Sequence, residues 1–168
     1  IKSLGVSSDG DSFAADDLLF TIYPWWDGPD VKEKIVNQLA GDSKLEKKKW
    51  VWIYHPPPDN SRVSWDGKRH FGDEYLLKWI TEYKPDIVLG GHVHQSPFSK
   101  DGSWIDKIGS TWVFNPGRQS GPMPTHIIFE MNHDEALWFS LAGAEYSKLN
   151  EPVKHPAEAL TQLPVWLT

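Results

Sequence analysis

The sequence predicts an α/β fold built around a pair of parallel strands. Two apolar stretches without polar alternation, Trp50–Tyr54 and Asp86–Leu89, are typical of strands covered on both faces. Between them apolar residues recur with the helical period, at Phe71, Tyr75, Leu76, Trp79, Ile80 and Tyr83. A strand, a helix and a second strand in this order favour parallel pairing, because the helix carries the chain back to the edge where the first strand began.

The residues before this unit predict one strand and one short helix. Residues 1–17 are polar and acidic, and we interpret them as a loop with at most a short strand. Leu18–Tyr23 is apolar and β-branched enough for a strand. Asp30–Ala40 has one apolar face and predicts a helix, with Asp30 as its N-cap and Gly41 at its C-terminal cap.

The residues after Gly91 predict short strands separated by Gly, Pro, Asn and Asp. These strands are Trp104–Ile108, Thr111–Phe114, Thr125–Met131 and Ala136–Leu141, of which the last two form a hairpin. Residues 142–168 contain three prolines and show no strong period, so we expect an extended C-terminal tail. We therefore expect a single domain over residues 1–168, with its core at about 18–141.

Composition limits the partners and the compartment. The 168 residues carry 17 Lys and Arg against 23 Asp and Glu, a net charge of −6, which is not typical of a nucleic-acid-binding domain. No apolar run approaches the roughly 18 residues that a membrane helix needs, so we expect no membrane partner. Cysteine is absent, which fits a reducing compartment and a cytoplasmic location.

Three of the seven histidines follow the two predicted central strands. His55 ends the first strand, and His92 and His94 follow the second, in Gly-Gly-His-Val-His. Because ligands of α/β sheets bind beyond the carboxyl ends of the strands, we expect these side chains in one crevice. An extended backbone places His92 and His94 on the same side. Imidazole is a ligand for Zn, Fe, Mn and Ni, so the sequence predicts a metal site of His55, His92 and His94.

A family resemblance rests on three stretches of sequence. WVWIYHPPP, PDIVLGGHVHQSP and TWVFNPGRQSGPMPTHIIFEM resemble the C-terminal half of the calcineurin-like metallophosphoesterases. Members of that family carry the blocks Asp-x-His, Gly-Asp-x-x-Asp, Gly-Asn-His-Asp/Glu, a single His and Gly-His-x-His, in that order. The last two blocks are present as His55 and as Gly91 to His94. The resemblance extends from about Leu18 to about Leu141.

The resemblance implies a fold, a reaction and a cofactor. The fold would be part of a four-layer α/β sandwich with two mixed β-sheets, apparently without its N-terminal portion. The chain would belong to a metal-dependent phosphoester hydrolase, a phosphatase or phosphodiesterase, with two divalent ions (Mn, Fe, Zn or Ni). His55 and His92 would bind one ion and His94 the other. A hydroxide of the dinuclear centre would attack phosphorus in line.

The resemblance also implies contacts and a missing part. Asn115 and Arg118 lie where the family has a turn close to the site, so they are candidate substrate-binding residues, with a plain turn as the alternative. Asp-x-His, Gly-Asp-x-x-Asp and Gly-Asn-His do not precede His55. We therefore expect a missing N-terminal segment to supply the Asp, His and Asn ligands, and the chain alone to be incomplete as an enzyme.

Two alternatives stay open. The ten tryptophans suit a non-catalytic module that binds carbohydrate, and a degenerate family member would keep the fold without metals. A planar row of exposed Trp rings would favour sugar binding, whereas buried Trp with converging histidines would favour the esterase. Trp25, Trp26 and Trp65 lie in predicted loops, where they can wall a pocket. Core positions are predicted for Trp50, Trp52, Trp79 and Trp138.

Overall fold

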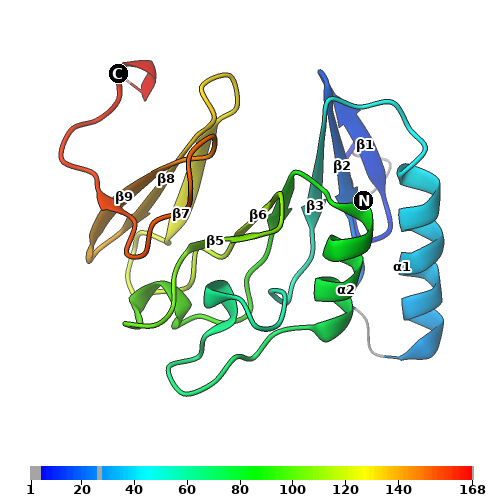
Figure 1. The fold of residues 1–168 in the computed structure, drawn as a ribbon, viewed down its shortest axis with the longest axis horizontal. Coiled ribbons are helices and arrows are strands. Elements are labelled where there is room, and N and C mark those ends of the chain that lie inside the picture. Colours follow the sequence, from blue (N-terminus) through cyan, green and yellow to red (C-terminus); the bar gives the residue numbers. More distant parts are fainter. Residues whose placement is uncertain (1–4, 26–27, 168) are drawn as a thin grey trace.

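The computed structural model describes residues 5–25 and 28–167, which are arranged in three layers. Two helices cover one face of a six-stranded sheet, and a four-stranded sheet lies against part of the other face (Figure 1). The α/β class with two sheets is therefore confirmed. The resemblance implied that both sheets are mixed, whereas the second sheet is antiparallel in all its pairings.

The elements of the first layers come in the order that the sequence predicts. The helices are α1 (Pro29–Asp42) and α2 (Glu74–Tyr83). The strands of the larger sheet are β1 (Ser12–Ala15), β2 (Leu18–Ile22), β3 (Lys49–Ile53), β4 (Ile87–Leu89), β5 (Ile105–Ile108) and β6 (Thr111–Phe114). Short 3-10 helices lie at Arg62–Ser64 (η2), Ser96–Phe98 (η3) and Val165–Leu167 (η4).

The larger sheet has a parallel centre and antiparallel edges. Its strand order is β1-β2-β3-β4-β6-β5, and β2, β3, β4 and β6 run parallel. The predicted parallel pair of β3 and β4 is confirmed, with Val51 opposite Ile87. Strands β1 and β5 are the antiparallel edges. All four parallel strands therefore end at the same edge of the sheet.

The apolar run of β3 serves two cores. Trp50 and Trp52 pack with the residues of α1 and α2, such as Leu39 and Ile80. Val51 lies in the other core, between the two sheets. Because both faces of β3 are covered, the strand has no polar alternation, and this is the pattern that predicted it.

The helix ends partly differ from the prediction. The N-cap of α1 is Gly28, and Asp30 lies in the first turn, because Pro29 occupies the first helical position. Gly41 lies inside the last turn of α1, so the prediction that it caps the helix is wrong. The N-cap of α2 is Asp73, whose carboxylate accepts hydrogen bonds from the first backbone N–H groups of the helix.

The second sheet is formed by the C-terminal third of the chain. Its strands, in the order β10-β9-β8-β7, are β7 (His126–Glu130), β8 (Glu135–Ser140), β9 (Gly143–Lys148) and β10 (Glu158–Ala159). The predicted hairpin of β7 and β8 is confirmed. The prediction of an extended tail over 142–168 is wrong for β9, which pairs with β8 along its whole length. Its sequence, GAEYSK, is small and polar, so pairing with β8 and not hydrophobic periodicity makes it a strand.

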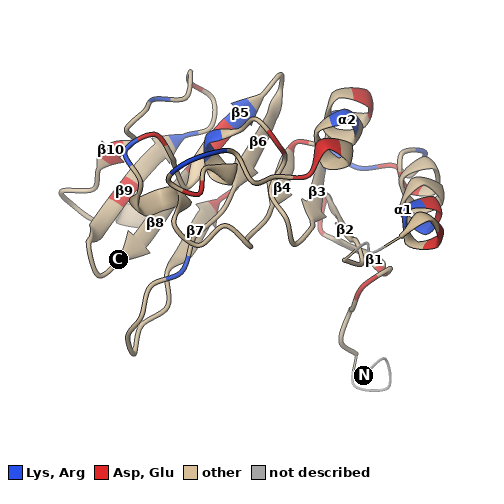
Figure 2. Cartoon of the chain, turned by 90° about the horizontal axis from the view of Figure 1, so that it is seen from below, with Lys and Arg blue, Asp and Glu red and all other residues tan. Residues whose placement is uncertain are grey.

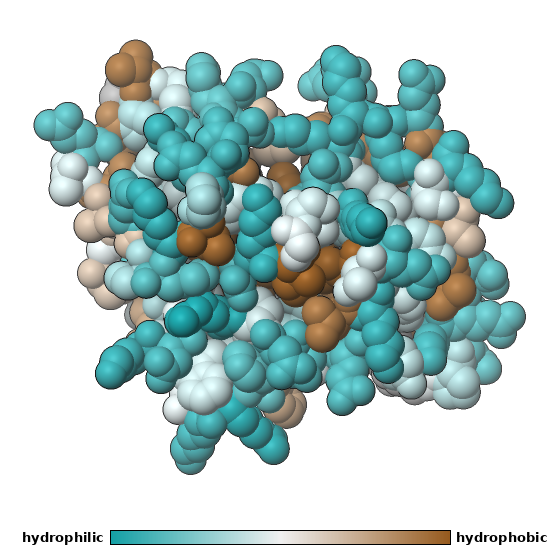
Figure 3. Space-filling view, in the orientation of Figure 1, coloured by the Kyte–Doolittle hydropathy of each residue, from teal (hydrophilic) through white to brown (hydrophobic). Residues whose placement is uncertain are grey.

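The surface carries charges of both signs. Lys and Arg are interspersed with Asp and Glu along α1 and over the strands (Figure 2). One face of the molecule is mostly hydrophilic, with hydrophobic residues in small patches (Figure 3). Over the described residues, none of the helices combines the length and the apolar character needed to span a membrane.

Candidate functional site

His55 and His92 lie together where the central strands end. His55 follows β3, and its backbone carbonyl accepts a hydrogen bond from the N–H of Gly91, which follows β4, at 2.9 Å. Nε2 of His55 lies 3.3 Å from Nδ1 of His92. The predicted convergence of these two side chains at one sheet edge is therefore confirmed, and its cause is the parallel register of β3 and β4.

Aromatic rings surround the two imidazoles. The ring of Trp25 lies 4.4 Å from that of His55 and 5.1 Å from that of His92. Phe71 stacks on His92 at 5.6 Å. Trp25 and Phe71 are each 48% exposed, so they form an apolar rim that remains open to solvent. Trp26 lies outside the described residues.

His94 lines a different hollow from the one that His92 lines. The backbone is not extended there: the N–H of Val93 donates to the carbonyl of Gly91 at 2.7 Å, and His92 has a φ of 64°. This hydrogen bond closes a γ-turn centred on His92, a strained conformation for a residue other than glycine. The turn breaks the two-residue alternation, so the premise of an extended backbone at His92 is wrong.

The pair of histidines fits a divalent cation. Partial burial, together with the neighbouring imidazoles of His92 and His94, lowers the pKa of His55, so its neutral, ligating form prevails at pH 7. Two imidazole nitrogens bound to one tetrahedral ion at about 2.0–2.1 Å lie about 3.3–3.4 Å apart. The observed nitrogen–nitrogen separation of 3.3 Å has this value and is also that of a hydrogen bond between the two imidazoles. In residues 5–25 and 28–167, however, no three His, Asp or Glu side chains are grouped closely enough to hold a metal ion.

Arg118 and Asn115 occupy opposite environments. Arg118 is exposed and lines a hollow of about 520 Å³ together with His94 and Gln95. Arg118 thus lies in the same hollow as the predicted ligand His94, and its contact with substrate stays a prediction. Asn115 is fully buried, and its side chain bonds only to protein groups, so the structure does not support the predicted contact of Asn115 with substrate.

Two further hollows flank the histidine pair, with Trp25 between them. One, of about 450 Å³, is lined by Asp9, His55 and Gly91, among others. The other, of about 370 Å³, includes Phe71 and His92. Asp9 and Phe71 line these hollows, although no motif in the sequence indicates them. The apolar period predicts Phe71 as part of the helix, whereas Phe71 lies two residues before the N-cap, Asp73.

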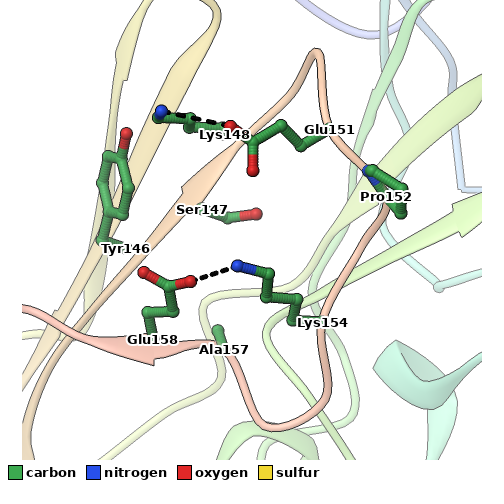
Figure 4. Close-up of a pocket in the computed structure, with 8 residues that line it drawn as sticks. All are labelled: Tyr146, Ser147, Lys148, Glu151, Pro152, Lys154, Ala157 and Glu158. Atoms are coloured by element: carbon green, nitrogen blue, oxygen red, sulfur yellow. Dashed lines mark hydrogen bonds and ion pairs between the residues drawn. The ribbon is translucent and has the colours of Figure 1, made fainter.

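A fourth hollow lies far along the chain, between β9 and the segment leading to β10 (Figure 4). Its volume is about 230 Å³. Its two lysines already have carboxylate partners: Lys148 pairs with Glu151 at 3.1 Å, and Lys154 pairs with Glu158. Because both lysine charges are compensated, this hollow is a weaker candidate for binding a charged ligand than the crevice at His55 and His92.

The burial of tryptophan bears on the alternative of sugar binding. Six tryptophans are buried: Trp50, Trp52, Trp79, Trp104, Trp112 and Trp138. Of the tryptophans that the structure describes, only Trp25 has an exposed side chain. There is thus no planar row of open Trp rings in the described part of the chain, and the core accounts for most of the unusual Trp content.

Comparisons with known proteins support the fold and little more. No protein-family model matches the sequence, and no curated protein matches it. One solved crystal structure superposes with a TM-score of 0.53 at 15% identity, covering 84% of this chain and 53% of that chain. This chain therefore spans about half the length of that protein. Identities this low show a common fold and nothing beyond it.

Two further solved structures are similar to this chain. The protein TT1561 of Thermus thermophilus has a TM-score of 0.45 at 13% identity, covering 84% of this chain and 58% of that chain. The purple acid phosphatase PPD1 from yellow lupin (Lupinus luteus) seeds has a TM-score of 0.43 at 16% identity, covering 85% of this chain and 31% of that chain.

Proposed function

We propose that this chain is part of a calcineurin-like metallophosphoesterase and takes part in metal-dependent hydrolysis of phosphoesters. The observation that carries the proposal is the pair of imidazole nitrogens of His55 and His92, 3.3 Å apart at the ends of adjacent parallel strands. The two residues belong to the family blocks that the sequence retains. Their spacing supports one shared divalent ion.

The roles of the individual residues follow from their positions. His55 and His92 hold one ion, and His94, two residues further on and facing another hollow, is available to a second ion. When bound, divalent ions (Mn, Fe, Zn or Ni) supply Lewis acidity toward phosphoryl oxygens. Arg118 lines the same hollow as His94, and its proposed role is to orient a phosphate oxygen of the substrate through its guanidinium.

Further ligands come from outside the described cluster. The family resemblance implies Asp and Asn ligands besides imidazoles, and the described residues form no group of three, so we propose that an additional segment supplies Asp, His and Asn ligands. The open aromatic rim of Trp25 and Phe71 leaves the histidine pair accessible to such a segment.

The proposal is tested first by metal binding. Mn²⁺ is added to ¹⁵N-labelled chain, and paramagnetic broadening of the imidazole resonances is followed. We expect His55 and His92 to broaden at the lowest Mn²⁺ concentrations, and His92→Ala to abolish the broadening at His55. The matched control is His133→Ala, which removes an exposed imidazole on the hairpin of β7 and β8.

Hydrolysis of an aryl phosphodiester in the presence of Mn²⁺ is the second measurement. Turnover that depends on His92, by this chain alone or with an added N-terminal segment, supports the proposal. Resonances of His55 and His92 that ignore Mn²⁺, Zn²⁺ and Ni²⁺ both in the folded chain alone and with an added N-terminal segment contradict it and favour the degenerate, metal-free member.

A further inference from the structure

The side chain of Asn115 bridges two loops at the site. Its Nδ2 donates one hydrogen bond to the carbonyl of Val93 and one to the carbonyl of Val63, each at 2.9 Å. Its Oδ1 accepts from the N–H of Gly117, also at 2.9 Å. Both N–H groups of the amide are thus used, in a fully buried position.

We infer that Asn115 is a positioning residue, which holds the turn at His92 in the conformation that brings this imidazole to His55. The inference rests on the proposed function for its purpose, since the conformation matters because of the metal that the two histidines share. It goes beyond that function by giving a role to a residue that touches neither metal nor substrate.

The turn at His92 needs such support. A γ-turn with positive φ is strained for a residue other than glycine and persists only where the surroundings impose it. Asn115 binds the carbonyl of Val93, the residue whose N–H closes the turn. The N–H of Arg118 binds the next carbonyl, that of His94, at 3.1 Å. The stretch from Asn115 to Arg118 therefore holds two successive carbonyls of the histidine loop.

The chemistry at this position requires an amide. The carbonyls of Val63 and Val93 are both acceptors, so a carboxylate of the same shape leaves them without donors and adds repulsion. Gly117 is needed as well, with a φ of 68°. A Cβ there would lie 2.7 Å from the ring of Pro97 and 2.9 Å from the carbonyl oxygen of His94.

The test compares two buried polar residues at opposite ends of β6: Thr111, the first residue of the strand, and Asn115, which follows its last residue. Asn115→Asp removes both donors to the loops. Thr111→Val, at the other end of β6, removes the buried hydrogen bond of 2.6 Å that the Thr111 hydroxyl donates to the carbonyl of Pro85. This hydrogen bond is remote from the histidines. Both variants should lower the melting temperature. Zn²⁺ affinity is measured by calorimetry and the protection of the Arg118 N–H by hydrogen exchange.

We expect Asn115→Asp alone to weaken Zn²⁺ binding about 10–100-fold, the usual effect of losing a group that orients a ligand. It should also lower the protection of the Arg118 N–H at least tenfold, whereas Thr111→Val should change neither quantity. If Asn115→Asp does not fold, Gly117→Ala displaces the same turn from its other side and is expected to have the same two effects.

The outcomes separate the two proposals. Unchanged Zn²⁺ affinity or unchanged Arg118 protection in folded Asn115→Asp overturns the inference, as does an equal effect of Thr111→Val. If the wild-type chain takes up no Zn²⁺, the proposed function fails, and hydrogen exchange at Arg118 still decides whether Asn115 holds the turn.

Discussion

Nε2 of His55 and Nδ1 of His92 face each other at 3.3 Å, although the two residues are 37 positions apart in the chain. The ring of Trp25 covers both imidazoles from one side. A cation held by the two histidines would therefore lie close to the indole of Trp25. The fluorescence of this indole can then be used to detect metal binding.

Trp25 is expected to report metal binding. Ni²⁺ has an open shell and quenches indole emission at short range, so Ni²⁺ should quench the wild-type chain more than Trp25→Phe. The measurement is a fluorescence titration at pH 7. The control is Trp166→Phe, since Trp166 donates to Glu135 on the second sheet, away from the histidines. Equal quenching of all three proteins would place the metal elsewhere.

Asp42 is expected to be a large single contributor to stability. Its Oδ2 accepts hydrogen bonds from Ser12 at 2.6 Å and Thr21 at 2.7 Å, and it is buried between α1 and the sheet. Asp42→Ala leaves both hydroxyls without this acceptor and should reduce the free energy of unfolding by about 2–3 kcal/mol. Denaturant unfolding measures the loss. Asp42→Asn keeps an acceptor and should lose less, and a larger loss for Asn than for Ala would refute this explanation.

Glu145 is expected to destabilise the protein at neutral pH. Burial raises its pKa, opposed by the hydrogen bond that Trp104 Nε1 donates to it at 2.6 Å. Glu145 ionises near pH 4.5 in the unfolded chain and at a higher pH in the folded protein. The stability of the fold therefore falls as the pH rises from the unfolded-state pKa to the folded-state pKa. Glu145→Gln keeps the acceptor without the charge, and should raise the melting temperature at pH 7 but not at pH 4. The exposed Glu33→Gln is the control, and a gain that persists at pH 4 would contradict this account.

His155 is expected to add acid sensitivity. Burial lowers its pKa, Arg62 lowers it further, and Asp106, whose Oδ1 lies 3.4 Å from Nε2, partly compensates. The unfolded chain therefore takes up the proton first as the pH falls below about 6.5, and stability is lost there. The melting temperature of His155→Gln should fall less between pH 7 and pH 5 than that of the wild type. His133→Gln should keep the wild-type slope, and parallel slopes for His155→Gln and wild type would exclude this role.

Gly41 is expected to be a site where stability increases. It lies inside α1, and a Cβ built there meets nothing within 4 Å. Gly41→Ala should stabilise the protein by about 0.5–1 kcal/mol, because alanine loses less backbone entropy in a helix. Gly102→Ala provides the contrast, since its Cβ would lie 2.1 Å from the carbonyl oxygen of Ser96. Destabilisation by Gly41→Ala would mean that the glycine acts as a helix terminus after all.

The main elements of the fold could be predicted because their signals are local. The uninterrupted apolar run of β3 and the helical period of α2 each reflect how many faces of the element are buried. The spacing of apolar residues along the sequence therefore indicates both elements. Strand β9 could not be predicted in this way, because its small and polar residues become a strand only by pairing with β8.

The sequence by itself determined that three histidines follow two parallel strands, and hence that His55 and His92 would meet at one edge of the sheet. The sequence also provides the amide side chain of Asn115 and, two residues later, the glycine of the turn, Gly117. Only the tertiary structure decided that His92 sits in a γ-turn, that His94 faces another hollow, and that Asn115 is buried beneath the turn. The reason is that a strained turn is stabilised by contacts with remote segments of the chain. Here the carbonyls of Val63 and Val93 both bind the amide of Asn115, and a local sequence pattern does not indicate such contacts.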